Sequence, residues 1–196
     1  ILPNLNKNIK NGNALIGMDY FSGQMFGDME EMKRVKPFEW KDEFPEVFKR
    51  GGFDVVIGNP PYIDSEWLTK TNPKLREYCV THYESAKGNW DIFCVFVEKC
   101  LKLSRQYSSM IVPNKLLSAD YARYTRNFIT SKHLLIKIRD FSNVPVFPVA
   151  VYPIVYVAKT TKLNNDESIV YELMRQIERD KVEVETKIAL SHEKLD

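Results

Sequence analysis

The sequence predicts an α/β domain built on a mixed sheet, and three observations lead to that class. First, the β-branched run from Val55 to Ile57 is typical of a strand, which must end before Pro60 and Pro61 because prolines cannot donate the hydrogen bonds of a sheet. Second, helix-like and strand-like segments alternate after these prolines. Third, the last two apolar runs are joined by a short turn-rich segment, which suits an antiparallel pair.

The first third of the chain predicts two strands and a helix. Residues 8–16 are expected to form a short strand that runs into a polar turn at Gly12 and Asn13, and a helix is expected around Gly27 to Lys36. A second strand is expected over residues 53–58. Because its β-branched residues are contiguous rather than alternating with polar ones, we expect this strand to be buried in the sheet.

The middle of the chain predicts a helix, a strand and a second helix. Asn89 or Asp91 is suited to cap a helix whose apolar side chains form a broad stripe from Ile92 to Leu103. Tyr107 to Pro113 is expected to form the next strand, which its proline ends, and Leu116 to Thr130 the next helix. Helices in this order would cover one face of a sheet.

The end of the chain predicts an antiparallel pair and then a change of character. Residues 134–141 and 149–158 are expected to be strands joined by residues 142–148. Beyond Thr160 the chain becomes a polar linker, followed by a strand-like run over residues 168–173 and a charged tail. The sequence therefore predicts a boundary near this point.

The composition fits one domain in a reducing compartment. With 196 residues, 44% of them hydrophobic and 12% aromatic, the chain has enough apolar surface to bury a core. Its longest apolar stretch, residues 144–158, is too short and too rich in proline to span a membrane. The three cysteines are odd in number and lack metal-ligand spacing, so we expect a cytoplasmic protein without a metal site.

The charge of the chain gives little indication of a partner. A net charge of +2 is too small by itself to indicate nucleic acid. A local group of basic residues is a better candidate for a phosphate-binding surface, although the same residues would equally suit a solvated face. The group consists of Arg123, Arg126, Lys132, Lys137 and Arg139.

The strongest candidate site is Asn59-Pro60-Pro61-Tyr62, which follows a strand at the edge where open α/β sheets bind ligands. The Asn59 side-chain oxygen and the Pro60 carbonyl are acceptors that match the two N–H bonds of a planar amine, and Tyr62 offers a ring face for stacking. Two such hydrogen bonds localise the nitrogen lone pair and favour its attack on an electrophilic methyl group. The alternative is a proline-rich turn with a packed tyrosine, but the preceding strand and Gly58 favour a site.

This tetrapeptide resembles the catalytic motif of S-adenosylmethionine-dependent amino-methyltransferases, above all the N6-adenine DNA methyltransferases of restriction–modification systems. The preceding segments 37–40, 44–48 and 51–54 are similar to those of large type II (type IIG-like) enzymes, which are often fused to a nuclease. The resemblance extends from about residue 7 to about residue 160. It implies a partial Rossmann-like class I S-adenosylmethionine-dependent methyltransferase domain that ends in an antiparallel strand pair.

The resemblance implies DNA adenine methylation, with S-adenosylmethionine as cofactor, double-stranded DNA as partner and no metal. The target adenine would be rotated out of the duplex and held between the rings of Tyr62 and Phe147. Asn59 and Pro60 would bind its amino group. A phenylalanine in an apolar stretch is more often a core residue, but the prolines that flank Phe147 favour the site, with Phe141 as second candidate. An endonuclease and a target-recognition domain, fused or associated, are further implied partners.

The implied cofactor contacts are Asn13 and Asn59. Asn13 matches the family's Asp or Asn that contacts the cofactor's adenine, with Asn11 as a weaker alternative, although an Asn in such a turn needs no function. The family's Gly-rich turn and acidic residue are not found before Asn13. We therefore expect residues 1–160 to be the C-terminal part of a catalytic domain that is inactive and binds the cofactor weakly in isolation. Residues 161–196 would lead toward an absent target-recognition domain.

Two other functions are compatible with parts of the sequence. Release-factor glutamine methyltransferases share a strand followed by Asn-Pro-Pro-Tyr-Ile, but they close the domain sooner, and the segment 38–48 and the surroundings of Phe147 favour DNA. A non-catalytic module that contacts DNA or serves assembly is the other alternative. An upstream Gly-rich cofactor motif in the longer gene would distinguish the catalytic readings from this one.

Overall fold

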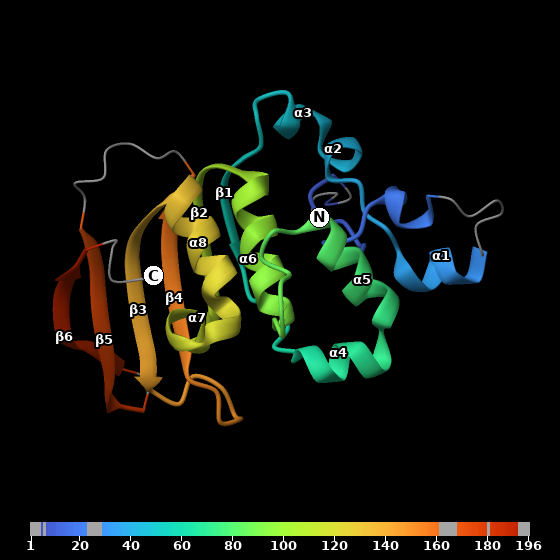
Figure 1. Ribbon diagram of the computed structural model, residues 1–196. Helices are drawn as coiled ribbons and strands as arrows, with labels where there is room; N and C mark the ends of the chain where they lie inside the picture. Colours follow the sequence, from blue (N-terminus) through green and yellow to red (C-terminus); the bar gives the residue numbers. More distant parts are fainter. Residues whose placement is uncertain (1–4, 6, 23–28, 161–167, 180, 192–196) are drawn as a thin grey trace. The chain divides into compact units, whose positions relative to one another are not determined.

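The computed structural model describes residues 5, 7–22, 29–160, 168–179 and 181–191 (Figure 1). The chain divides into two compact units, residues 1–52 and residues 53–196, and each is described by itself.

The first unit consists of short helices around an aromatic cluster. Its elements are η1 (Met18–Phe21), α1 (Met29–Val35), α2 (Trp40–Glu43) and α3 (Pro45–Phe48). The ring of Trp40 stacks on Phe44 at 6.0 Å and meets Phe38 edge to face at 4.9 Å, while the Trp40 indole N–H donates to the Ala14 carbonyl. The expected helix in this region is confirmed by α1.

The expected strand over residues 8–16 is wrong. Its described residues make only an isolated bridge, between Asn13 and Pro37. The Asn13 side-chain oxygen accepts a hydrogen bond from the Leu15 amide at 3.1 Å, two residues along the chain. Such a local bond replaces the ladder partners of a strand, so the backbone bends where the pattern predicted extension.

The second unit contains a mixed sheet with the strand order β1-β2-β4-β3-β5-β6. β1 is parallel to β2, and β4 is antiparallel to both β2 and β3. β5 is parallel to β3 and antiparallel to β6. The predicted mixed sheet and its antiparallel pair, β3 with β4, are therefore confirmed. The strands are β1 (Phe53–Gly58), β2 (Ser104–Pro113), β3 (Leu134–Asn143), β4 (Pro153–Lys159), β5 (Ile169–Glu178) and β6 (Lys181–Leu190).

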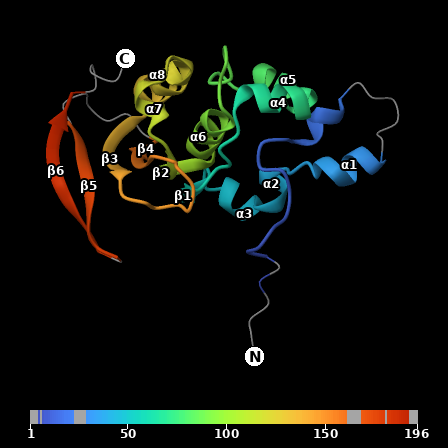
Figure 2. The ribbon, with the colours of Figure 1, turned by 90° about the horizontal axis from the view of Figure 1, so that it is seen from below.

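Helices pack on one face of this sheet, where Figure 2 shows α6, α7 and α8 together. α6 fills the core with Phe93, Cys94 and Val97, each of which is fully buried against β2 and β4. Among the helices of the described residues, none is long and apolar enough to cross a membrane. The helices of this unit are α4 (Ser65–Thr71), α5 (Pro73–His82), α6 (Ile92–Leu103), α7 (Lys115–Ser118), η2 (Asp120–Ala122) and α8 (Arg123–Lys132).

The continuous helix expected over residues 116–130 is interrupted at Ala119, whose backbone is extended. The buried Arg126 guanidinium explains the interruption. It donates to the Leu116 carbonyl at 3.1 Å and to the Ala119 carbonyl at 2.9 Å. An unbroken helix would use both carbonyls within its own ladder, whereas the broken one leaves them for a buried cation.

β1 is a strand, as expected, but it is not buried. Val56 packs toward the core, whereas Val55 is 55% and Ile57 77% exposed. β1 lies at the end of the strand order and pairs with β2 alone in the described sheet. Alternate side chains of a strand point to opposite faces, so the side chains of Val55 and Ile57 lie on the face opposite the core helices.

The sheet continues past the boundary expected near residue 160. The strand-like run expected over residues 168–173 belongs to β5, which pairs directly with β3 and is followed by β6. Buried Glu172 of β5 binds Lys137 at 2.9 Å and Arg139 at 2.8 Å, both from β3. The C-terminal strand pair is thus joined to the sheet by side chains as well as by the backbone.

Candidate active site

The loop after β1 presents Asn59 to solvent. The Asn59 side chain is exposed and makes no hydrogen bond with the other described residues, so its amide is free to bind a ligand. Pro60 is buried and Pro61 exposed. Because two consecutive prolines fix φ at both positions, the loop leaves the strand in a restricted conformation. Asn59 and Pro60 therefore present their polar groups from a stiff segment directly after β1.

Tyr62 is anchored at its hydroxyl. The Tyr62 O–H donates to the Ile111 carbonyl near the end of β2 at 3.1 Å, and burial raises the pKa of the Tyr62 phenol. The phenol therefore stays a neutral donor across the physiological range. This bond fixes the direction of the ring relative to β2.

Phe147 meets this ring. The two ring centroids lie 6.1 Å apart with an interplanar angle of 87°, so the contact is edge to face. Phe147 also lines a hollow of about 280 Å³, formed by the loop between β3 and β4. Phe141 is not among the residues that line this hollow. The structure thus brings the rings of Phe147 and Tyr62 into contact, while their role on the two faces of a base stays a prediction.

The segment that follows the motif is held by the start of α6. The Ile92 amide donates to the Ile63 carbonyl at 3.0 Å, and the Asp91 carboxylate accepts a hydrogen bond from the Tyr121 hydroxyl at 2.6 Å. Asp64 caps α4 by accepting from the Trp67 amide at 2.7 Å. The chain is therefore fixed immediately after Tyr62.

Asp91 has an unusual electrostatic environment. Burial raises the pKa of its carboxyl, against the Tyr121 hydrogen bond and the charge of Lys115, which lower it. Its side chain makes no capping bond to α6, although sequence suggested it as a cap. No sequence signal distinguishes a cap from this anchor, because the partner Tyr121 is remote in the chain.

Asn13, the other predicted cofactor contact, lies in the first unit. Its side-chain oxygen is used by the Leu15 amide, while the Asn11 oxygen accepts from the Lys36 ammonium at 3.1 Å. The Asn13 N–H₂ group is left to donate, which fits a ring nitrogen of an adenine. The described glycines with positive φ, Gly51, Gly52 and Gly88, do not follow a strand and open a helix as a Gly-rich cofactor turn would.

The predicted basic surface is not formed as one surface. Arg126 is buried, and Lys137 and Arg139 bind Glu172. Lys132 is paired with Glu84. Arg126 therefore lies inside the core, whereas Arg123, Lys132 and Arg139 are exposed, so the five residues do not share one surface.

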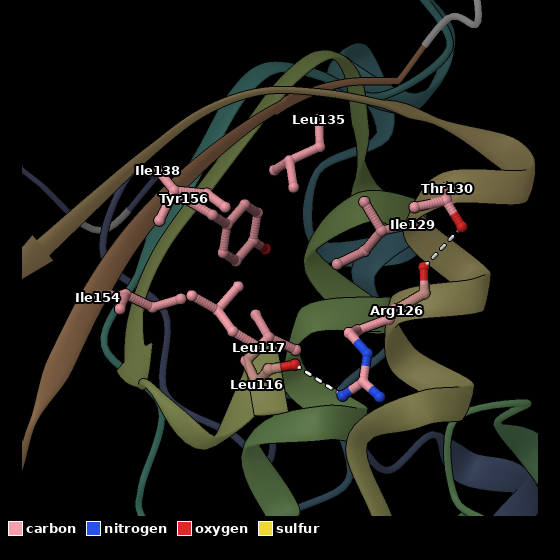
Figure 3. Close-up of a pocket in the computed structure, with 9 residues that line it drawn as sticks. All are labelled: Leu116, Leu117, Arg126, Ile129, Thr130, Leu135, Ile138, Ile154 and Tyr156. Atoms are coloured by element: carbon pink, nitrogen blue, oxygen red, sulfur yellow. Dashed lines mark hydrogen bonds between the residues drawn. The ribbon is translucent and has the colours of Figure 1, made fainter. Parts of the chain in front are cut away.

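A second hollow lies inside the core, between α7, α8 and the sheet (Figure 3). Its volume is about 10 Å³, and its lining is apolar apart from Arg126, Thr130 and the Tyr156 hydroxyl. Figure 3 shows the Arg126 guanidinium directed at the Leu116 carbonyl. A space of this size suits at most one water molecule, so the hollow is a packing feature and not a ligand site.

A model of the Eco57I restriction-modification methylase family matches residues 2–147. The chain belongs to this family. The predicted resemblance to type II restriction–modification methyltransferases is therefore confirmed.

Two relatives illustrate the match. The type II restriction enzyme and methyltransferase RM.Eco57I of Escherichia coli is 29% identical over 149 residues, which are 75% of this chain and 14% of the relative. The type II methyltransferase M.BstVI of Geobacillus stearothermophilus is 29% identical over 163 residues, 80% of this chain and 28% of the relative. The chain thus spans less than a third of the length of these two relatives.

Solved structures share the fold. A protein described as a class I S-adenosylmethionine-dependent methyltransferase from Listeria monocytogenes superposes with a TM-score of 0.50 over 62% of this chain and 36% of its own, at 14% identity. The type IIL restriction-modification enzyme MmeI, solved in complex with DNA, gives a TM-score of 0.53 over 78% of this chain and 20% of its own, at 12% identity. The predicted methyltransferase fold class is confirmed, and methyltransferases of this fold depend on S-adenosylmethionine.

Proposed function

We propose that the full-length protein methylates DNA at the N6 amino group of adenine, with S-adenosylmethionine as methyl donor, within a restriction–modification enzyme. The observation that carries the proposal is the exposed, unbonded Asn59 amide directly after β1, in the loop whose Tyr62 ring contacts Phe147. Membership of a restriction–modification methylase family supports DNA as the substrate class over a protein glutamine. The proposed partners are double-stranded DNA, a target-recognition domain and an endonuclease.

The proposed chemistry uses the two acceptors at the end of β1. The exocyclic amine of adenine would donate one N–H to the Asn59 oxygen and the other to the Pro60 carbonyl. These bonds oppose delocalisation of the nitrogen lone pair into the ring and direct it outward. When bound, S-adenosylmethionine supplies a methyl group on a positively charged sulfur. Most of the acceleration would then come from holding the amine in line with that methyl group.

The aromatic pair would bind the base after it leaves the duplex. An adenine inside the stack cannot reach the loop after β1, so it must be rotated out. Tyr62, fixed by its bond to the Ile111 carbonyl, offers one face for stacking. Phe147 stands perpendicular to that ring, so it would turn to cover the second face of the base. Because Phe147 lies in the loop between β3 and β4, rotation of its ring would not require the strands to move.

Cofactor contacts within this proposal are Asn13, through its N–H₂ group, and Asn59. They belong to different units of the chain.

Product analysis in the full-length protein tests the proposal. DNA methylated with tritiated S-adenosylmethionine is digested to nucleosides, and we expect the label in N6-methyladenine. Label in N4-methylcytosine or in protein would contradict the proposed substrate. An Asn59→Ala variant assayed in parallel shows whether the labelled product depends on the loop after β1.

A further inference from the structure

The loop that carries Phe147 is held at both of its ends by one residue. The Asn114 amide donates to the Tyr152 carbonyl at 2.7 Å, and the Asn114 side-chain N–H₂ donates to the Ser142 hydroxyl at 3.1 Å. Ser142 and Tyr152 are the first and last residues of the lining of the hollow beside Phe147. Asn114 directly follows β2, three residues after the carbonyl that binds Tyr62. The Tyr62 ring and the loop that carries Phe147 are therefore both hydrogen-bonded to the same end of β2.

Ser142 is in turn oriented by a buried carboxylate. One oxygen of Asp140 accepts from the Ser142 amide at 2.8 Å and from the Ser142 hydroxyl at 2.5 Å. Its other oxygen accepts from the Tyr171 hydroxyl at 2.6 Å. Asp140 is only 7% exposed, so these bonds form in a low-dielectric environment where hydrogen bonds to a charged acceptor are strong.

These contacts form a chain of hydrogen bonds, and the donor and the acceptor of each bond are fixed. Tyr171 donates to Asp140, and the Ser142 hydroxyl donates to Asp140 while it accepts from Asn114. Burial and the Asp140 bond raise the pKa of the Tyr171 phenol, so Tyr171 remains a donor. The Tyr171 hydroxyl only donates, whereas the Ser142 hydroxyl donates once and accepts once, and removal of either hydroxyl interrupts the side-chain connection from β5 to the end of β2.

We propose that Asn114, Ser142 and Asp140, together with Tyr171 of β5, are positioning residues that set the loop bearing Phe147 for capture of the flipped base. The proposal rests on the proposed function, because it assumes that Phe147 contacts the base. The C-terminal strand pair would then contribute to the site, because Tyr171 of β5 is the last residue in the chain of hydrogen bonds.

The test uses the full-length protein and a duplex with 2-aminopurine at the target position, whose fluorescence rises when the base leaves the stack. Ser142→Ala removes two hydrogen bonds of the chain, so we expect it to lower kcat about tenfold and to reduce the fluorescence of the complex. The Kd for DNA should change less than about twofold, because phosphate contacts dominate it. Ser142→Thr, which keeps the hydroxyl, should restore the fluorescence. Ser118→Ala, an exposed serine outside the chain, is the matched control.

Tyr171→Phe gives an independent measurement, because it removes a single oxygen and keeps the ring. We expect a smaller loss of fluorescence in the same direction, even if Ser142→Ala fails to fold. Unchanged kcat and fluorescence in Tyr171→Phe and in folded Ser142→Ala would overturn the proposal. Asn59→Ala and Phe147→Ala distinguish failure of this inference from failure of the proposed function. If these two variants impair methylation while the positioning variants do not, only this inference fails. If these two variants also leave methylation unchanged, the proposed function fails.

Discussion

The ring of Tyr62 meets the ring of Phe147 edge to face, with 6.1 Å between their centroids, although the two residues lie on loops from different strands. Tyr62 follows β1 and is bonded to β2, whereas Phe147 lies between β3 and β4. Asn59, three residues before Tyr62, is exposed and makes no hydrogen bond with the other described residues. Three strands of the sheet thus direct their loops to one edge.

Removal of either ring should weaken capture of the base without weakening DNA binding. Stacking on an aromatic side chain is worth about 1–3 kcal/mol per base, so Tyr62→Ala and Phe147→Ala should each alter the 2-aminopurine fluorescence of the complex and lower the methylation rate. Tyr62→Phe loses only the bond to the Ile111 carbonyl, so its effect should be smaller. If Phe141→Ala alters both signals and Phe147→Ala neither, the wrong aromatic has been assigned.

Asn59 should act on the chemical step. Asn59→Ala removes one of the two proposed acceptors of the amine, and the loss of a preorganised hydrogen bond of this kind lowers kcat by roughly 10²-fold or more. Because Asn59 is exposed and supports no other described residue, the free energy of unfolding should change by less than about 0.5 kcal/mol. Asn127→Ala on the exposed side of α8 is the control. Near-normal incorporation of tritiated methyl groups by Asn59→Ala would refute the catalytic role.

The sequence was most informative where local pattern and tertiary structure agree. The β-branched run and the prolines predicted β1 and its abrupt end, and the apolar stripe predicted α6, because in both cases the side chains that define the pattern also set the backbone. The motif and the flanking prolines led to Tyr62 and Phe147 as the pair that holds a base; the structure shows their rings in contact, and their role stays a prediction.

The sequence predictions that were wrong depend on side-chain bonds and on strand order, which hydrophobic patterns do not record. The interruption at Ala119 depends on Arg126, and the bend at Asn13 depends on one side-chain bond to Leu15; neither alters hydrophobic periodicity. The exposure of β1 depends on strand order, which a strand's own sequence does not encode. The anchor formed by Asp91 and Tyr121 joins residues thirty positions apart, so no local signal reveals it.

Glu98 should be important for stability rather than activity. This fully buried carboxylate accepts hydrogen bonds from the amides of Glu84 and Ser85 and binds the Lys102 ammonium at 2.6 Å. Glu98→Ala would leave these amides without their acceptor, so we expect a loss of about 2–4 kcal/mol in the free energy of unfolding by urea. The exposed Glu66→Ala should change it by less than about 0.5 kcal/mol. Equal urea midpoints for both variants would show that Glu98 is not a structural acceptor.

Glu172 should make the sheet sensitive to acid. Hydrogen bonds from Lys137 and Arg139 lower the pKa of the Glu172 carboxyl below its ordinary value. Its stabilising contribution is therefore fully present above the unfolded-state pKa, about 4.3, and is lost as the pH falls through the lower folded-state value. Glu172→Gln should be less stable than wild type at pH 7, and the two should converge in acid. Urea titrations at several pH values measure this, and a constant difference down to strong acid would contradict it.

Asp91 should have the opposite pH dependence, because burial raises the pKa of its carboxyl. A raised acid pKa means that the folded state binds the proton more tightly, so stability falls as the pH rises from the unfolded-state value, about 3.9, through the folded-state value. Asp91→Asn keeps an oxygen that can accept from the Tyr121 hydroxyl but cannot ionise, so it should gain stability relative to wild type across that window. Tyr121→Phe removes the bond that lowers the Asp91 pKa, so its stability should fall more steeply with rising pH than that of wild type. Urea unfolding of the three proteins between pH 3 and pH 8 decides the matter. Parallel curves for wild type and Asp91→Asn would mean that the carboxyl titrates normally, and the segment after Tyr62 would then be held without an electrostatic penalty.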